Sequence, residues 1–209
     1  MREGTHMRRW AELICLFILL PTAMALEWLP GAKLFWLLGA ALGCGIWLAV
    51  SAPGGKKWRI TRPGPLPAGM LWRIGVAAVV VTALTLVLHP ERFLELPRRR
   101  TGLWLLIMAL YPMLSAWPQE IIYRGFFFQR YAALFHRPWA MILASGAVFA
   151  YVHVIYANTL ALSLSLVGGV LLSQAYARDQ SLFWVTVEHA AYGLLVFTLG
   201  LGRYFYQGG

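Results

Sequence analysis

The residues of this sequence that could do chemistry gather in its second half, beginning with a short polar stretch in apolar surroundings. Residues 118–131 read PQEIIYRGFFFQRY, and Glu120 and Arg124 stand four positions apart in this stretch. On a helix, that spacing places a carboxylate and a guanidinium on one face, one turn from each other. Ionisable groups are costly among apolar side chains, so we expect this pair to belong to a polar site.

Three further ionisable residues fall inside apolar segments downstream, namely His153, Glu188 and His189. Taken singly, His153 could be a core histidine bonded to a carbonyl group, and Glu188 and His189 could be an interfacial pair. Glu120 and Arg124 could likewise be an ion pair that fixes helix packing. Because the five residues come from three separate helices, their conjunction predicts instead one polar site inside a helical bundle.

These side chains could activate water. A buried carboxylate can act as a general base near neutral pH, and an imidazole from a second helix can share the water molecule with it. A second imidazole can donate a hydrogen bond to a developing oxyanion. Such a site would hydrolyse an amide without a covalent intermediate. A serine nucleophile is poorly supported, because Ser145 lies two helical turns from His153.

A metal-dependent version of the same chemistry stays open. Glu120, His153 and His189 provide the two imidazoles and one carboxylate of a catalytic zinc set. The sequence contains no HExxH pair, however. We therefore expect no cofactor, with a divalent metal such as zinc as the alternative.

The composition places these residues in a membrane protein. Of the 209 residues, 60% are hydrophobic and 12% are charged, whereas soluble domains are about 45–50% apolar and about 25% charged. The net charge of +10 is typical of basic loops that meet lipid headgroups. No basic patch with interleaved aromatic residues stands apart from the apolar segments, so nucleic acid is not an expected partner. Cys15 and Cys44 lie inside apolar runs and are expected to be inert, buried thiols.

The apolar segments predict an all-α, polytopic transmembrane helical bundle with about seven spans, six to eight being defensible. The segments are residues 10–29, 34–50, 70–88, 102–117 continuing to about 135, 138–156, 159–177 and 181–200. Residues 102–135 could form one long tilted helix or a span followed by a second, partly inserted helix, and Pro112 is expected to kink it. Residues 1–101 carry no motif, and residues 102–209 would form the catalytic core of the same integral membrane domain.

The basic residues favour a cytoplasmic N-terminus. This orientation places the following groups inside: Arg2, Arg8, Arg9, the basic residues of 56–62, Arg130, Arg137 and Arg178. It leaves the basic run at 98–100 outside, so the rule favours the orientation without securing it.

Taken in chain order, the motifs resemble those of a known family. Glu120-x-x-x-Arg124-Gly125 is followed by Phe149-x-x-x-His153, by a glycine-rich segment with Gly168 and Tyr176, and by SLFW at 181–184 leading to His189-Ala190. This order is similar to the CAAX protease and bacteriocin-processing (CPBP or Abi) family of intramembrane proteases. The resemblance covers about residues 111–201, less than half of the chain.

The resemblance implies a role for each matching residue. His153 would activate water with a carboxylate of the first motif, and Glu120 matches the second of the family's two glutamates. His189 would form the oxyanion hole, and Arg124 would orient the acidic pair. Further residues expected to assist or to contact the substrate are Gln119, Phe149, Glu188 and Tyr192.

Two positions depart from the family pattern. Gln119 stands where the first glutamate, the usual base, is expected, and Gly193 stands where an asparagine is expected. An amide cannot take a proton from water. Either Glu120 has taken over as the base, or the protein is not a protease, or Gln119 is an engineered inactivating change. Tyr192 or a backbone N–H could replace the asparagine, and Glu188 points about 100° away from its neighbour His189 around the helix.

The leading hypothesis is a glutamic-type intramembrane endopeptidase of a bacterial cytoplasmic membrane, acting on a membrane protein or on a lipidated or terminal peptide. The alternative is a catalytically silent relative that binds a membrane peptide or protein as an immunity or chaperone-like partner. A proton-coupled transporter is a weaker option, because the sequence shows no related halves.

Overall fold

A computed structural model describes residues 2–51 and 64–205. The described backbone is helical and contains no strand, so the predicted all-α fold is confirmed. The basic loop residues Lys56, Lys57, Arg59 and Arg62, which the predicted orientation places in the cytoplasm, lie outside the described residues.

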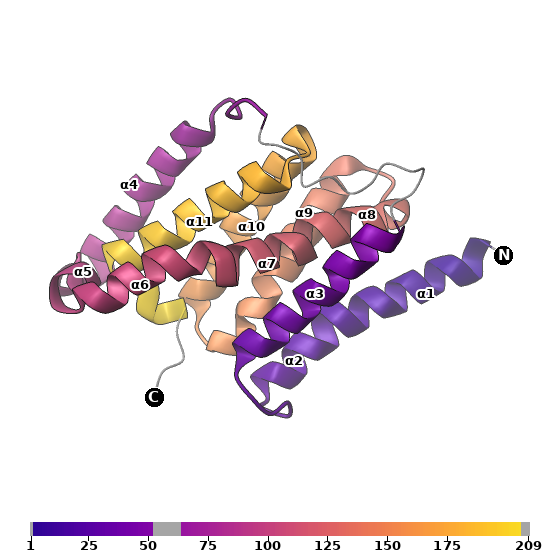
Figure 1. Cartoon of the computed structure of the whole chain (residues 1–209), viewed down its shortest axis with the longest axis horizontal. Coiled ribbons are helices and arrows are strands. Elements are labelled where there is room, and N and C mark those ends of the chain that lie inside the picture. The colour runs from indigo at the N-terminus through magenta and orange to yellow at the C-terminus, as the bar shows by residue number, and fades with distance from the viewer. Residues whose placement is uncertain (1, 52–63, 206–209) are drawn as a thin grey trace.

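The N-terminal half consists of one outlying helical run, two long helices and a short helical connection (Figure 1). The run joins α1 (Arg2–Ile14), the π-helical turn η1 (Cys15–Leu19) and α2 (Leu20–Ala25). It is followed by α3 (Lys33–Ser51), α4 (Met70–Leu88), the 3-10 turn η3 (Pro90–Arg92) and the short α5 (Glu95–Arg99). Met70 to Leu88 matches the predicted third segment at both ends.

One long helical run supplies the first motif. It joins α6 (Thr101–Tyr111), η4 (Pro112–Ala116), α7 (Trp117–Glu120), η5 (Ile121–Phe126), α8 (Phe127–Tyr131) and η6 (Ala132–Leu134). Of the two arrangements left open for residues 102–135, the structure therefore has the single helix, which spans 34 residues from Thr101 to Leu134. At 1.5 Å per residue this run is about 50 Å long, longer than the ~30 Å hydrocarbon layer of a bilayer.

Two π-helical turns interrupt this run, η4 before α7 and η5 after it. Pro112, the expected kink, opens η4. A proline has no N–H for the helical ladder, and a π turn is one way to accommodate the loss. The two turns enclose the four residues of α7, which include Gln119 and Glu120.

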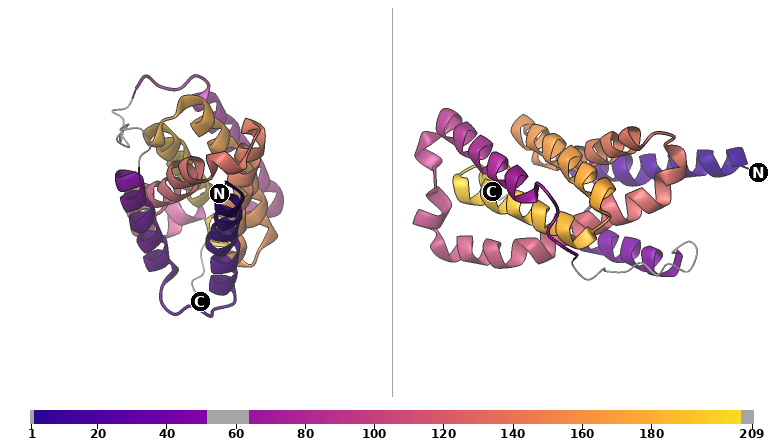
Figure 2. Two further views of the ribbon diagram at one scale, coloured as in Figure 1. Left: turned by 90° about the vertical axis from the view of Figure 1, so that its right-hand side faces the viewer. Right: turned by 90° about the horizontal axis from the view of Figure 1, so that it is seen from above.

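The remaining helices complete the bundle. They are α9 (Pro138–Val152), η7 (His153–Tyr156), α10 (Thr159–Asp179), α11 (Leu182–Leu199) and η8 (Gly202–Phe205). Side-chain caps begin two of them: Asn158 accepts a hydrogen bond from the Ala161 amide and Ser181 accepts one from the Trp184 amide. In the views of Figures 1 and 2, α11 packs between α4 and the α6 run, with α10 against its other side.

Two glycines allow α9 and α10 to pack closely. A Cβ atom at Gly146 would lie 2.9 Å from the backbone nitrogen of Val170, and one at Gly169 would lie 2.9 Å from the carbonyl oxygen of Gly146. Any side chain at either position would therefore push the two helices apart. The close approach matters for the site, because it presents the carbonyl oxygen of Gly169 to the first motif.

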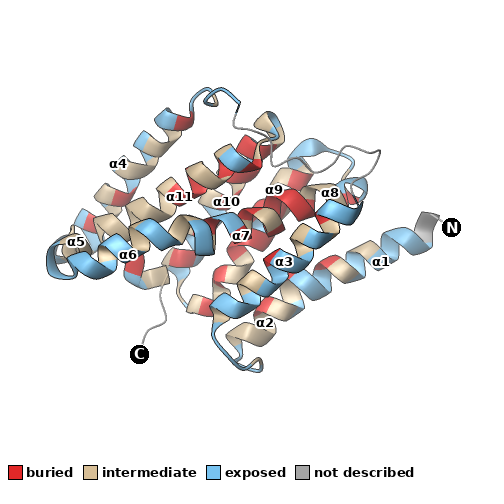
Figure 3. Ribbon diagram, viewed as in Figure 1, coloured by how far each residue is buried: buried red, intermediate tan, exposed pale blue. Residues whose placement is uncertain are grey.

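Much of the outer face of the bundle is exposed (Figure 3), and many of its large side chains are apolar. Exposed fractions reach 81% for Val50 on α3, and 80% for Val87 and 76% for Trp72 on α4, which is typical of lipid-facing surfaces rather than of surfaces in water. Among the described residues, six helices are long and apolar enough to cross a membrane. They are Lys33–Ser51, Met70–Leu88, Thr101–Leu134, Pro138–Tyr156, Thr159–Asp179 and Leu182–Leu199.

This number lies within the predicted six to eight spans. The N-terminal run, which carries Arg8, Arg9 and Glu12, is not among the six.

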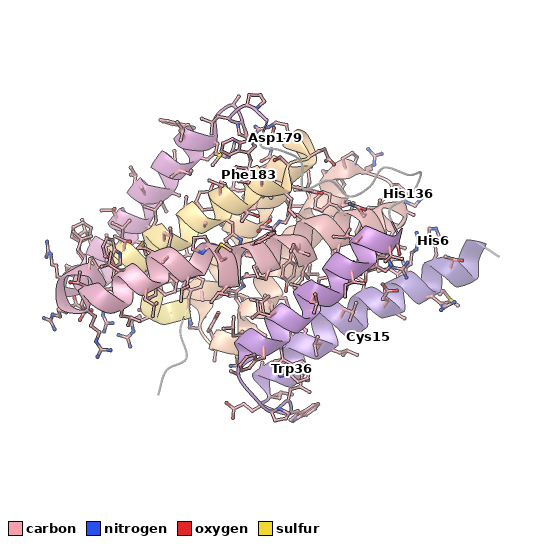
Figure 4. All side chains as sticks on the ribbon, viewed as in Figure 1. His6, Cys15, Trp36, His136, Asp179 and Phe183 are labelled. Atoms are coloured by element: carbon pink, nitrogen blue, oxygen red, sulfur yellow. The ribbon has the colours of Figure 1, made fainter. Side chains whose placement is uncertain are left out.

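The cysteine of this run, Cys15, corrects one prediction. Cys15 is exposed on this run (Figure 4), because its segment is packed on one face only, so the expectation of a buried thiol is wrong for Cys15. Cys44 is half-buried.

Candidate active site

Glu120 and Arg124 lie at the centre of the bundle, and neither side chain is exposed. Nη1 of Arg124 donates a hydrogen bond to Oε1 of Glu120 over 2.9 Å. Nη2 donates to the carbonyl oxygen of Gly169, also over 2.9 Å, and the guanidinium lies 4.6 Å from the centroid of the Phe149 ring. Contacts with three elements therefore fix Arg124, and Arg124 in turn fixes the carboxylate.

His189 meets the same carboxylate oxygen. Its Nδ1 lies 2.6 Å from Oε1 of Glu120, although the two residues are 69 positions apart in the chain. The other oxygen, Oε2, is buried and has no hydrogen-bond partner among the described residues. Oε1 also accepts a hydrogen bond from Arg124, so Nδ1 of His189 is the donor in this pair and carries the hydrogen atom. The pair is a carboxylate that orients an imidazole, an arrangement found in many hydrolytic sites.

His153 lies at the end of α9, where the chain turns into η7. Its Nδ1 lies 2.8 Å from the carbonyl oxygen of Phe149, and its ring packs on the Phe149 ring with centroids 5.0 Å apart. Since a carbonyl only accepts, Nδ1 donates and Nε2 keeps its lone pair. The core-histidine hydrogen bond considered from the sequence is therefore present, and it leaves the opposite nitrogen available as a base.

One cavity brings the two histidines together. It has a volume of about 180 Å³, and His153 and His189 both line it. Gln119, Tyr111 and Phe149 form further parts of its wall. Glu120 is fully buried and does not line the cavity. It contacts His189, which does. The sequence-predicted residues thus converge in one place, with the imidazoles facing the cavity and the ion pair behind them.

A second, more apolar cavity of about 260 Å³ adjoins the first. Ser115, Gln119, His153 and Tyr156 line both. The rest of its wall comes from η1, α2, α3, the first-motif run and the end of α9 with η7, and includes Leu20, Ala40 and Phe126. A group bound there would lie beside the two histidines, so the pair of cavities provides a polar reaction space next to an apolar one.

Gln119 stands between these two spaces. Its Nε2 donates a hydrogen bond to Oγ of Ser115 over 2.8 Å, one helical turn back. The position where the family pattern has a glutamate therefore faces the candidate active site, while Glu120 points to Arg124 and His189.

Glu188 and Tyr192, considered as auxiliary residues, have other partners. Glu188 accepts hydrogen bonds from Nε and Nη2 of Arg73 over 2.7 and 2.8 Å, and the Tyr192 hydroxyl donates to its Oε1 over 2.6 Å. Tyr192 therefore directs its hydroxyl away from His189, and Glu188 joins α11 to α4.

Ser145 is also accounted for by packing. Its hydroxyl is fully buried, donates to the carbonyl oxygen of Tyr123 and accepts from the Ser173 hydroxyl.

A metal ion has no ready-made ligand set here: among the described residues, no three His, Cys, Asp or Glu side chains are grouped so that they could hold one. Glu120, His153 and His189 share a site without forming a three-ligand set.

Tyr111 was not foreseen from the sequence. Its hydroxyl lies 3.3 Å from Nε2 of His189, and its ring packs edge-on against the His189 ring. On a straight α-helix, Tyr111 and Gln119 would be rotated about 80° apart, eight residues at 100° each. The π turn η4 between them absorbs one residue and brings them to within about 20°, onto one face of the run. The signal, a proline directly after Tyr111, is visible in the sequence but does not by itself predict a π turn.

The comparisons with known proteins agree with the motifs. Residues 101–195, which are 95 of the 209 residues, match the family described as type II CAAX prenyl endopeptidase Rce1-like. The match contains α6 to α10 and most of α11, and with them every residue of the two cavities' shared wall. No curated protein and no solved structure matched the chain. The match confirms the resemblance seen in the sequence and supports a membrane protein of protease type.

Proposed function

We propose that this chain, whose residues 101–195 match the Rce1-like family, is an intramembrane endopeptidase that hydrolyses a peptide bond of a membrane-associated protein or peptide. One observation carries the proposal: a buried carboxylate orients His189 at the wall of a cavity that His153 also lines. Two imidazoles at one cavity can divide the work, one transferring protons and the other stabilising an oxyanion.

In the proposed mechanism, His153 takes the proton from the attacking water. Its Nδ1 is engaged with the Phe149 carbonyl, so Nε2 is the basic atom. The water oxygen then adds to the carbonyl carbon of the scissile bond, and the carbonyl oxygen becomes an oxyanion. His153 can afterwards return its proton to the leaving amine, so the imidazole is regenerated in each turnover.

His189 stabilises the oxyanion. The Glu120 carboxylate, 2.6 Å from Nδ1, stabilises a positive charge on this ring, so a protonated Nε2 can donate to the developing negative charge. Glu120 therefore acts through His189, and Arg124 holds Glu120 in position. This division differs from the one expected from the sequence, in which Glu120 itself shared the water with His153.

The replacement of the family's first glutamate is compatible with this mechanism. Gln119 faces both cavities but cannot accept a proton from water. Because His153 supplies the base, Gln119 has only to hydrogen-bond the water or the scissile amide.

The adjoining cavity supports an apolar substrate. It is lined mainly by aliphatic and aromatic side chains and meets the reaction space at Gln119 and His153. An apolar group next to the scissile bond would fill it, which suits a membrane-embedded or terminal peptide segment. We place the enzyme in a bacterial cytoplasmic membrane with its N-terminus inside, in keeping with the distribution of basic residues.

Comparison of protein termini in cells tests the proposal. Membranes from cells that express the wild-type chain should contain new protein N-termini that are missing when the chain carries Glu120→Ala. A Glu188→Gln variant, altered at the other core carboxylate, serves as the matched control and should retain these termini. If wild-type and Glu120→Ala cells show the same termini, the chain is not a protease in those cells. A cellular phenotype that survives His153→Ala would then favour a silent, peptide-binding relative.

A further inference from the structure

Tyr111 and Gly193 fit one another at the cavity wall. A Cβ atom added at Gly193 would lie 2.3 Å from the Tyr111 hydroxyl oxygen and 2.3 Å from the ring carbon that bears it. Real Cβ atoms do not approach other atoms so closely, so a side chain at residue 193 would require the Tyr111 phenol to move. The phenol of Tyr111 thus occupies the space that a side chain at 193, one turn after His189 on α11, would fill.

The ring of Tyr111 is held in this place from two sides. It packs edge-on against Phe197 with ring centroids 5.7 Å apart and edge-on against His189 with centroids 6.2 Å apart. Its hydroxyl lies 3.3 Å from Nε2 of His189 and faces the same cavity. Tyr192, the donor considered from the sequence, is engaged with Glu188 instead.

We propose that the Tyr111 hydroxyl is a second hydrogen-bond donor to the oxyanion, taking the place that the missing side chain at Gly193 leaves open. The proposal rests on the proposed peptide-bond hydrolysis. Nδ1 of His189 donates to Glu120, so in the neutral ring Nε2 accepts a hydrogen bond from the phenol.

Protonation of His189 breaks that bond, because Nε2 no longer accepts. During the reaction Nε2–H donates to the oxyanion, and the O–H of Tyr111, released from Nε2, turns to the same oxyanion. No proton leaves Tyr111 in this exchange. Its hydroxyl and the imidazolium together provide the oxyanion hole, and both are in position before the substrate binds.

The Tyr111→Phe variant tests this role, because it removes only the hydroxyl oxygen. With the best-cleaved member of a quenched-fluorescent library of short apolar peptides in liposomes, we expect kcat to fall about 100-fold, the usual effect of removing one oxyanion donor. KM should stay about the same, since the donor acts mainly on the transition state. A kcat within about twofold of the wild-type value would overturn the proposal.

A side-chain exchange separates the catalytic role from packing. Gly193→Asn alone should be inactive and less stable, because the new side chain clashes with Tyr111. Combined with Tyr111→Ala, the same asparagine has room and can donate a hydrogen bond from position 193. We expect the double variant to be faster than either single variant. A double variant no faster than Tyr111→Ala would contradict a shared donor site.

The contact itself has a readout that needs no activity. In protein labelled with ¹⁵N-histidine, Tyr111→Phe should shift the Nε2 resonance of His189 and leave that of His153 unchanged. An unmoved His189 resonance would overturn the contact. If the wild-type chain cleaves no peptide while the resonance does move, the contact is correct and the proposed hydrolysis is wrong, so the two failures are distinguishable.

Discussion

Two buried carboxylates in the core of this bundle have opposite surroundings. Glu120 and Glu188 are 0% and 1% exposed, and each is paired with an arginine. Glu188 uses both of its oxygens in a two-pronged bond with Arg73, and Tyr192 adds a third hydrogen bond. Both of its oxygens therefore already accept hydrogen bonds, mainly from the Arg73 side chain that joins α4 to α11.

Glu120 is bonded on one side only. Arg124 and His189 both contact Oε1, and Oε2 has no partner among the described residues. A buried polar atom without a partner is costly and marks a site where structure has been kept for another purpose. The difference indicates that Glu188 holds helices together, whereas Glu120 fixes the orientation of an imidazole that faces a cavity.

The largest expected effect comes from the imidazoles. We expect His153→Ala and His189→Ala each to lower the cleavage rate at least about 10³-fold, because each removes a group that transfers a proton or stabilises the oxyanion. Glu120→Ala should act similarly. Cleavage of a reporter peptide in liposomes measures all three. Full activity in the three variants would show that the reaction, if any, takes place elsewhere.

Replacing each of the two buried carboxylates' arginines should lower the unfolding free energy by a different amount. Arg124→Met leaves Glu120 buried without its cation and should lower the unfolding free energy by about 3–5 kcal/mol. The side chain of Arg73 is 19% exposed, and when it is removed Glu188 still accepts the hydrogen bond of Tyr192. Arg73→Met should therefore lower the unfolding free energy by only about 1–3 kcal/mol. Denaturation in detergent micelles measures both. Loss of cleavage activity in the folded fraction of Arg73→Met would contradict the purely structural role assigned to Glu188.

A gain of function is expected at Gln119. Gln119→Glu places a second acceptor for protons on the cavity wall, so we expect cleavage to rise about tenfold. Gln119→Met, which is similar in size and cannot accept a proton, is the control and should show no gain. A Gln119→Glu rate no higher than that of the wild type would contradict the expected gain and show that a carboxylate at position 119 adds nothing to the base that His153 supplies.

Metal removal should have the smallest effect. Glu120 is engaged with Arg124 and His189 rather than grouped with both histidines as a ligand set. Dialysis against a strong chelator should therefore leave the cleavage rate unchanged, with metal content measured on the same sample. Loss of activity that zinc restores would favour the metal-dependent reaction.

Local spacing was enough to predict part of this site. Glu120 and Arg124 are one turn apart, so the contact between them follows from helix geometry. The apolar composition likewise predicted the membrane bundle, and the order of motifs predicted the family. Sequence could also place His153 and His189 inside the bundle, since such groups are costly against lipid.

The remaining contacts depend on packing between distant segments. Glu188 and Arg73 are 115 positions apart, and nothing in either local sequence selects this pair. The same holds for Glu12 on the N-terminal run, which accepts hydrogen bonds from Arg130 and Tyr131. Tyr111 could not be predicted for a different reason. The π turn after it brings it onto the same face of the helix as Gln119, whereas the spacing of a regular α-helix would place the two on different faces.

The most direct test compares the two carboxylates by the same substitution. Glu120→Gln and Glu188→Gln each replace a carboxylate by an amide of the same shape, and single-turnover cleavage in liposomes measures their effect on the chemical step. We expect Glu120→Gln to be slower than the wild type by about 10³-fold or more, as for other carboxylates that orient a catalytic imidazole. Glu188→Gln should stay within about threefold of the wild type once its folded fraction is taken into account. Equal rates for the two variants, or a fully active Glu120→Gln, would contradict the account.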